Sequence, residues 1–390
     1  MLLEDAEQTL AAVLAPLSVD AFVDEVLPGG FRLLRHDADA ARGGLLGPDP
    51  AGTLANAVHL AGKLTWHSAN ALGPAPSLAD VADAADFRER IAAFHALNYS
   101  VRFPDLRPLS PALDEIARAL EVMLHAPVTV SAFWSVSGMR APVHYDDHDL
   151  IVIQLEGNKR WHVARRASDL FNPWKGVDGN PPDLGDHETV DVRPGDLVYL
   201  PRGTFHTVDS TEESLHVAIG FTPLTVREAL VAALDHLSDL DRPLRATLPR
   251  RGLAQVGPPT LAAAGRLLEA VRNPAFLSAA LQRRAARTVG DLQPLPRPTA
   301  TPVIGLDSEL AHAPGATSHL SAGADTLDFA FPGGHLYIHR GVQDAVLFVA
   351  DTPCFRVRDL PGGLADEVKL ALCARFLEVG FLRLEEICNA

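Results

Sequence analysis

Cysteine, lysine and long apolar runs are scarce in this sequence. Its 390 residues include three cysteines, Cys354, Cys373 and Cys388, which lie late in the chain without metal-ligand spacing. A disulfide framework is therefore not expected, and a reducing compartment is favoured. No run approaches the ~18 consecutive apolar residues of a membrane-spanning helix, and the first residues carry acids where a signal peptide carries bases. We therefore expect a cytoplasmic protein that does not span a membrane.

The charge balance is acidic. Lys and Arg total 34 and Asp and Glu total 49, which gives a net charge of −15. With 47% hydrophobic and 21% charged residues, the composition is that of a globular protein and excludes wholesale disorder or a fibrous repeat. The length is typical of two or three domains. An acidic surface makes nucleic acid an unlikely substrate.

The pattern changes from helix to strand near residue 128. Ser110 and Pro111 begin a predicted helix with an apolar stripe at Leu113, Ile116 and Leu120. Short β-branched and aromatic segments follow, separated by Gly, Pro, Asp and Asn, at residues 128–136, 150–155, 196–201 and 215–221. Because no long helices lie between these segments, we expect an antiparallel sandwich or barrel.

Helical patterns return at Thr225, where Thr225 and Glu228 form a predicted capping box. The stretch 242–287 holds nine arginines and one acid, Glu269, and we interpret it as a solvated rim. A proline-rich run at 294–302 indicates a stiff linker. Beyond it we expect a hairpin around 332–334, a strand at 345–350 and a final helix at about 364–387, together a small α+β module.

The motif His144-Tyr145-Asp146 is the only His-x-Asp or His-x-Glu motif in a sequence with sixteen histidines. On a strand, residues i and i+2 face the same side, so an imidazole and a carboxylate can hold one metal ion. Composition alone predicts about one such motif by chance, so an ordinary surface pair is the alternative. Asp147 and Asp149 alternate away from Asp146, and we expect them to face outward or to contact substrate.

A second segment strengthens the metal hypothesis. Residues 194–206 follow the order turn, strand, tight turn and then His206, which brings an imidazole to a strand end. Two His and one carboxylate with open positions are typical of non-haem Fe(II) oxygenases. Lys159, one of four lysines, follows a predicted strand and turn. Facing a barrel interior it would need an anion as partner; the alternative is a solvated turn lysine. For His216 two interpretations remain open: a residue that lines the pocket, or a hydrogen-bonded histidine of the core.

Together, HYDDHDLIVIQLEGNKRWHV (144–163) and PGDLVYLPRGTFH (194–206) resemble the JmjC-type cupins of the ribosomal oxygenase group, which are 2-oxoglutarate-dependent protein hydroxylases. Residues 17–35 and 221–237 are also similar to this family. The resemblance implies a mainly β fold with α: a double-stranded β-helix, a helical dimerisation region and a winged-helix-like α+β module. The corresponding predicted domains are a JmjC/cupin catalytic domain with its N-terminal extension (1–224), the dimerisation region (225–292) and the C-terminal module (303–390).

Carried over by motif, His144, Asp146 and His206 match the iron ligands of this family. Lys159 matches the residue that holds the distal carboxylate of 2-oxoglutarate, and Ser135 matches a cosubstrate contact in part of the family. Two departures are expected to alter the pocket. Some relatives place Asn and Tyr where this chain has Val130 and Ala132, and some place Ser at Gly220.

The resemblance implies an Fe(II)- and 2-oxoglutarate-dependent dioxygenase, which consumes dioxygen and hydroxylates a side chain of a protein or peptide. A ribosomal protein or a precursor peptide is the expected substrate, and a homodimer is the expected assembly. One alternative keeps this chemistry and acts on a small metabolite. Another is a non-catalytic cupin scaffold. The C-terminal module holds thirteen acids and seven bases over residues 291–390, so we interpret it as structural or protein-docking.

Overall fold

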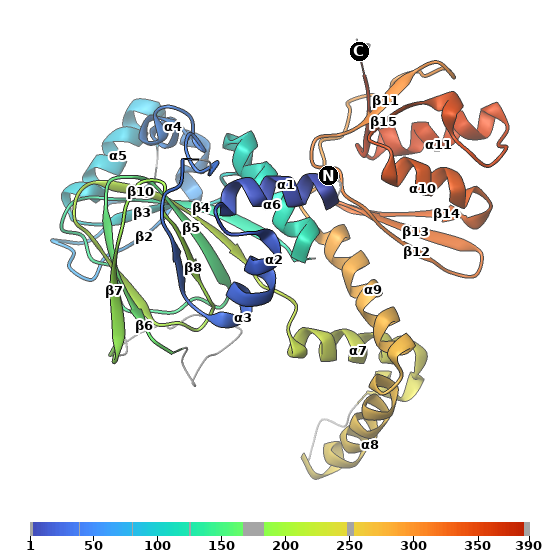
Figure 1. The fold of residues 1–390 in the computed structure, drawn as a ribbon, viewed down its shortest axis with the longest axis horizontal. Coiled ribbons are helices and arrows are strands. Elements are labelled where there is room, and N and C mark those ends of the chain that lie inside the picture. Colours follow the sequence, from blue (N-terminus) through green and yellow to red (C-terminus); the bar gives the residue numbers. More distant parts are fainter. Residues whose placement is uncertain are drawn as a thin grey trace. The chain divides into compact units, whose positions relative to one another are not determined.

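The computed structural model describes residues 3–38, 40–79, 81–124, 126–166, 183–247 and 253–385. The chain divides into two compact units, Leu3–Thr222 and Pro223–Ala390 (Figure 1). The boundary lies close to the predicted end of the cupin domain at residue 224. A further division of the second unit into 225–292 and 303–390 stays a prediction. Among the described helices, none combines the length and the apolar character needed to cross a membrane.

The first unit is built on two antiparallel sheets. Its strands are β1 (Arg32–Leu34), β2 (Thr65–His67), β3 (Ser100–Phe103), β4 (Val128–Ser135), β5 (Asp149–Glu156), β6 (Lys159–Ala164), β7 (His187–Val192), β8 (Leu197–Leu200), β9 (His206–Ser210) and β10 (Ser214–Phe221). Seven of them form a sheet in the order β1-β8-β5-β10-β4-β3-β2, and three form a sheet in the order β7-β6-β9. The expected antiparallel β architecture is confirmed.

The two sheets pack face to face around a shared apolar core. Val152 of β5, Val198 of β8 and Ala218 of β10 come from the larger sheet, and Val163 of β6 and Val208 of β9 come from the smaller one. All five side chains are buried. Side chains alternate along each strand, so every second residue points inward. The residues at these alternate positions determine which side chains line the interior.

Helices border the sheets of this unit. They are α1 (Leu3–Leu14), α2 (Val19–Ala21), α3 (Leu27–Gly29), α4 (Pro50–Ala55), α5 (Ala84–Ala96) and α6 (Pro111–Leu124). The predicted helix after Ser110 is α6, and the Ser110 Oγ accepts a hydrogen bond from the Leu113 N–H at 3.2 Å. The predicted stripe of Leu113, Ile116 and Leu120 is buried, and α6 packs against α1.

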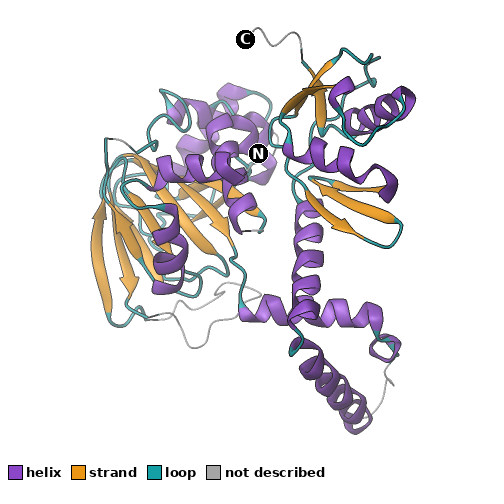
Figure 2. Ribbon diagram, turned by 45° about the vertical axis from the view of Figure 1, so that its right-hand side comes forward, coloured by secondary structure: helices purple, strands orange, loops and turns teal. Residues whose placement is uncertain are grey.

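The second unit begins with helices α7 (Val226–Leu240), α8 (Leu253–Val271) and α9 (Pro274–Asp291), visible in Figure 2. Thr225 caps α7 as predicted, because its Oγ1 accepts from the Glu228 N–H at 3.2 Å. Arginines of the basic stretch pair with acids of α7: Arg283 with Asp239 at 2.6 Å and Arg287 with Asp235 at 2.9 Å. The local positive excess is therefore partly balanced within the unit.

Two small sheets and two helices complete this unit. Their elements are β11 (Glu309–His312), β12 (His319–Ala322), β13 (Thr326–Phe331), β14 (Gly334–His339), α10 (Gln343–Asp351), β15 (Cys354–Arg356), α11 (Asp366–Glu378) and β16 (Leu382–Leu384). The sheet orders are β12-β13-β14 and β15-β11-β16. The predicted hairpin around 332–334 is confirmed as β13–β14. Leu295, in the run predicted to be a linker, is buried in the core of these sheets.

Two predictions for this region are wrong. Residues 345–350 belong to helix α10, not to a strand. Ala345, Val346 and Val349 are buried, and this spacing of three and four suits one helix face, but an apolar run of six residues does not reveal its period. The final helix was predicted to run from about 364 to 387, but α11 ends at Glu378, and a strand, β16, follows it.

Gly380 ends α11 because it adopts a left-handed conformation with φ of +81°. The Phe381 N–H donates to the Phe376 carbonyl at 3.0 Å, and the Gly380 N–H donates to the Leu377 carbonyl at 3.0 Å. This is a Schellman ending, and the Phe376 and Phe381 rings contact each other across it, as such endings favour. The chain then turns into β16.

Candidate metal centre and adjoining cavity

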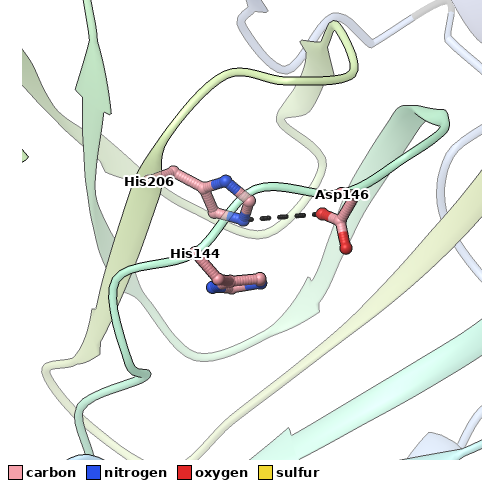
Figure 3. Close-up of side chains that lie close together, drawn as sticks. All are labelled: His144, Asp146 and His206. Atoms are coloured by element: carbon pink, nitrogen blue, oxygen red, sulfur yellow. Dashed lines mark ion pairs between the residues drawn. The ribbon is translucent and has the colours of Figure 1, made fainter. Parts of the chain in front are cut away.

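His144, Asp146 and His206 lie together at one mouth of the first unit's β-structure. His206 is the first residue of β9, as expected for a side chain at a strand end. His144 and Asp146 lie in the connection before β5 and not on a regular strand, which corrects the strand expected there. Figure 3 shows the two segments bringing the three side chains toward one another.

Backbone hydrogen bonds fix the two histidines opposite each other. The His144 N–H donates to the His206 carbonyl at 3.0 Å, and the His206 N–H donates to the His144 carbonyl at 2.8 Å. Directly opposed residues of an antiparallel pair project to the same face, with Cβ atoms about 5 Å apart. The ring centroids are accordingly 4.3 Å apart. One reciprocal pair of bonds thus joins side chains that are 62 positions apart in the sequence.

Each histidine is also held by its own Nδ1 atom. The His144 Nδ1 lies 2.9 Å from the Pro142 carbonyl, and the His206 Nδ1 lies 3.0 Å from the Thr204 carbonyl. A carbonyl only accepts, so each Nδ1 carries the proton and each Nε2 keeps a free lone pair. A hydrogen bond at the far ring nitrogen is the usual support of a metal-ligating histidine.

The potential ligand atoms of His144, Asp146 and His206 lie within 4.8 Å of one another. The His206 Nε2 is 3.8 Å from an oxygen of Asp146. Burial lowers the pKa of His206 to about 4, and the nearby His144 adds to this shift. The His206 ring is therefore neutral and able to ligate at neutral pH.

This donor set suits a divalent ion with open coordination positions. Two imidazoles and one carboxylate are the ligands of non-haem Fe(II) sites, and a closed structural zinc site would need a fourth protein ligand. The described residues offer one group of three or more His, Cys, Asp or Glu side chains close enough to share an ion, and it is this one. The residues present thus fit a catalytic metal better than a structural one.

A cavity of about 380 Å³ extends from these three residues into the space between the sheets. Lys159 lines it, with 2% of its surface exposed. Its Nζ lies 3.1 Å from the Ser135 Oγ and 2.8 Å from the His216 Nδ1. Burial lowers the pKa of Lys159 to about 7. Lys159 is therefore a buried cavity residue, and the alternative of a solvated turn lysine is wrong.

Ser135 and His216 are the two residues that hold Lys159 at this end of the cavity. Ser135 is fully buried, and its Oγ lies 2.8 Å from the Ser100 Oγ as well as near Lys159. His216 both lines the cavity and is buried, so the two alternatives left open for it are true together. Burial, with the nearby Lys159 charge, lowers the pKa of His216 well below its usual value, so its Nδ1 accepts the hydrogen bond from Lys159.

The departures expected at Val130 and Ala132 concern the wrong face of β4. Both side chains are buried but do not line the cavity. The cavity side of β4 presents Thr129, Ser131 and Phe133 instead. Because side chains alternate, a shift of one residue in matching a strand to its relatives exchanges the two faces.

The departure at Gly220 has a visible counterpart. A Cβ atom at Gly220 would lie 2.5 Å from the imidazole of His148 and 2.9 Å from the Thr129 Oγ1. His148 thus fills the space that a side chain at position 220 would need, and it lines the cavity there.

Asp149 was expected to face outward or to contact substrate, and this expectation is wrong. Its side chain is buried, and it accepts hydrogen bonds from the Tyr199 hydroxyl at 2.7 Å and the Arg202 N–H at 3.1 Å.

The cavity residues that the sequence did not predict include three on the short strands β2 and β3: His67, Ser100 and Arg102. Burial lowers the pKa of His67 to about 3, and the His144 and Lys159 charges add to this. These strands are three and four residues long. The alternation of polar Ser100 and Arg102 with apolar Val101 and Phe103 was the available signal for β3.

Comparison with known proteins agrees with this geometry. Residues 109–229, which include the three clustered side chains, match the family model of the JmjC domain. This part of the chain is therefore a JmjC domain, and the resemblance to ribosomal-oxygenase-type JmjC cupins is confirmed.

Among curated proteins, the chain is similar to ribosomal oxygenase 2 of Bos taurus, with 29% identity over 165 residues, covering 40% of this chain and 36% of that protein. It is also similar to the bifunctional lysine-specific demethylase and histidyl-hydroxylase NO66 of Drosophila willistoni. The identity there is 28% over 133 residues, covering 32% of this chain and 17% of that protein. The matched region thus spans about a third or less of the length of these relatives.

Among solved structures, Escherichia coli YcfD shares the fold along nearly the whole chain. The TM-score is 0.56 at 18% identity, covering 95% of this chain and 98% of that one. A structure of YcfD, described as a ribosomal oxygenase, in complex with cobalt and 2-oxoglutarate matches with a TM-score of 0.53 at 18% identity, covering 95% and 99%. At this identity the likeness shows a shared JmjC/cupin-like fold.

The clustered ligands predict tight binding of one divalent ion. We expect His144→Ala to weaken Co(II) binding at least 100-fold, because only two protein ligands remain. Titration followed by the visible absorption of Co(II) measures this. His148→Ala, four residues along and outside the cluster, is the matched control and should keep affinity within about threefold. Equal loss in both variants would contradict the assignment.

Proposed function

We propose that this protein is an Fe(II)- and 2-oxoglutarate-dependent dioxygenase that hydroxylates a side chain of a protein or peptide. The observation that carries the proposal is the presence, in one cavity, of a His-Asp-His cluster and a buried lysine whose partners among the described residues are a hydroxyl and an imidazole, with no carboxylate. A bound metal ion would explain the cluster, and an anionic cosubstrate would explain the buried lysine. The names of the relatives, which include a ribosomal oxygenase and a histidyl-hydroxylase, support the same activity.

In this proposal, His144, Asp146 and His206 hold Fe(II) and leave its remaining positions to 2-oxoglutarate and dioxygen. Bound iron would supply the oxidising chemistry: one oxygen atom of O₂ enters a substrate C–H bond, the other enters succinate, and 2-oxoglutarate loses carbon dioxide. The protein's part is to fix the two imidazoles through backbone contacts and to exclude water from the cavity.

Lys159 receives the distal carboxylate of 2-oxoglutarate in this proposal, with Ser135 beside it. A buried ammonium group costs several kcal/mol unless it is paired with an anion. Within the described chain, its hydrogen-bond partners are the neutral Ser135 and His216. A charge-assisted bond to a carboxylate would restore the charged form. A non-catalytic scaffold would have no use for such a costly group.

Succinate formation tests the proposed activity. Purified protein incubated with Fe(II), 2-oxoglutarate, air and ribosomal protein or peptide fractions should form succinate and shift a component by +16 Da, and His144→Ala should reduce both at least 100-fold. Intact-mass spectrometry and succinate detection provide the two readouts. Equal succinate from the wild type and His144→Ala would end the oxygenase proposal, whereas succinate with a modified metabolite and no modified peptide would favour the small-molecule alternative.

The pKa of Lys159 predicts how 2-oxoglutarate binding varies with pH. The pKa is about 7 in the free protein and must rise when a carboxylate binds. Affinity should therefore be constant below pH 7 and fall about tenfold per pH unit between pH 7 and 9, because each binding event then takes up a proton. Calorimetric titration at pH 6 to 9 measures the slope.

Lys159→Arg is the matched control for this effect, since arginine stays charged across the range. Its affinity should vary less than threefold from pH 7 to 9, whatever its absolute value. Lys159→Met should lose binding at least 100-fold at pH 6. A flat profile in the wild type would contradict the assignment of Lys159.

We also propose a cytoplasmic homodimer that associates through the helical region 225–292, with residues 303–390 as a winged-helix-like module. Apolar side chains on α7 and α8 are exposed in the single chain, among them Leu230, Leu234, Leu261 and Leu268. An exposed apolar face of this kind is typical of a subunit contact.

Light scattering after size exclusion tests the assembly. Wild-type protein should elute as a dimer, and the double variant Leu261→Glu/Leu268→Glu should shift it to the monomer because two charges enter the contact. Val303→Glu changes an apolar residue outside these helices that is even more exposed, and this variant should remain dimeric. A monomeric wild type would refute the homodimer.

A further inference from the structure

Arg102 is a second cation of the cavity, and its position separates it from Lys159. It lies on β3 and pairs in register with Phe133 of β4. Its Nη2 lies 2.8 Å from the Ser131 Oγ, and its guanidinium carbon lies 6.0 Å from the centre of the Phe133 ring. The guanidinium is therefore held in place at the wall of the cavity.

The two cations contact different hydroxyls of one strand. Lys159 contacts Ser135 and Arg102 contacts Ser131, on the same face of β4. Four residues of strand span about 13 Å, so the two serines are separate contact points. A carboxylate held by Lys159 and Ser135 therefore leaves Arg102 and Ser131 available to a second anion.

Arg102 has no acidic partner of its own. In the part of the chain that the structure describes, no carboxylate oxygen lies within 4.0 Å of its guanidinium nitrogens. Burial lowers its pKa, and Asp146 acts in the opposite direction. Once Asp146 ligates a metal, its charge is shared with the ion and this compensation falls.

Ser131 adds a hydroxyl donor beside the guanidinium. Its oxygen accepts from Arg102, so its own proton stays available to donate to an anion. Among the described residues lining the cavity, Asp146 is the single acid. A cationic side chain would find only the metal ligand as a partner, whereas a carboxylate would find a guanidinium and a hydroxyl.

We propose that Arg102, with Ser131, is the specificity determinant for an acidic target residue, so that the peptide side chain reaching the metal is an aspartate or glutamate. This rests on the proposed function and adds the substrate class. Bidentate pairing of guanidinium with carboxylate supplies both energy and orientation.

Peptide selection tests the inference without turnover. The protein is loaded with Mn(II) and 2-oxoglutarate under anaerobic conditions and offered nine-residue peptide pools, whose central residue is fixed as Asp, Glu, Asn, Gln, Arg or His and whose other positions are random. Mass spectrometry quantifies the bound fraction. The Asp or Glu pool should be enriched at least tenfold over its amide counterpart. Arg102→Gln should reduce that enrichment about 10- to 100-fold, the loss expected for a charge-assisted pair.

Two controls distinguish recognition from damage. Arg102→Lys should retain part of the acidic preference. In both variants the dissociation constant for 2-oxoglutarate should stay within about twofold of the wild-type value. The temperature of half-unfolding should be unchanged in both. Enrichment of the Arg, His or amide pools, no enrichment at all, or a parallel loss of 2-oxoglutarate binding would overturn the inference. So would Arg102-dependent binding of a small acid such as N-acetylaspartate amide without any peptide selection.

The outcome also separates this inference from the proposed function. Selected acidic peptides that bind through Arg102 but gain no oxygen under Fe(II) and air would refute the hydroxylase and leave Arg102 as an acid-recognising residue. Hydroxylation of a neutral or basic side chain that is unchanged in Arg102→Gln would support the hydroxylase and refute the role of Arg102.

Discussion

The reciprocal backbone hydrogen bonds between His144 and His206 are the constraint on which the candidate metal centre depends. A metal site needs its ligands within a few ångströms, yet the chain supplies them from segments far apart in sequence. Side-chain packing alone would not fix the relative position of the two imidazole rings. Two main-chain bonds, with each Nδ1 also tied to a carbonyl, fix the rings before any ion arrives, so little ordering remains to be done on binding.

The register of the larger sheet extends this constraint into the cavity. β10 lies between β4 and β5, and the inward positions form rows across these three strands. Thr129, Gly220 and Leu150 share one row, and Phe133, His216 and Gln154 share another. Lys159 contacts the row of Phe133, His216 and Gln154 through His216, whereas His148 lies against Gly220 in the other row. The two ends of the cavity therefore differ in chemistry.

The parts of the fold that sequence could predict are those written in local periodicity. The helix after Ser110, the cap at Thr225 and the hairpin of β13 and β14 follow from neighbouring residues. Where local signals are ambiguous the predictions failed: a six-residue apolar run became α10, and the cavity face of β4 was taken to be that of Val130 and Ala132. His67 lies on a strand of three residues, which is too short to show a period. Residues 100–103 do alternate, but the place of Arg102 in the cavity is set by the pairing of β3 with the distant β4. The cluster of His144, Asp146 and His206 was predictable because spacing and resemblance agreed on these residues.

Buried cations in this unit fall into two kinds, and the contrast bears on function. Arg107 pairs with Asp114 and Glu121, and Arg42 donates to carbonyl oxygens of Val13, Ala15 and Gly195. Both are satisfied by the fold itself, and removing either would leave stranded acceptors. Lys159 is equally buried but has only a hydroxyl and an imidazole as described partners. A fold that satisfies two cations internally, one with carboxylates and one with several carbonyls, has the means to satisfy a third. That it leaves Lys159 facing a cavity is the feature a binding site requires and a structural core does not.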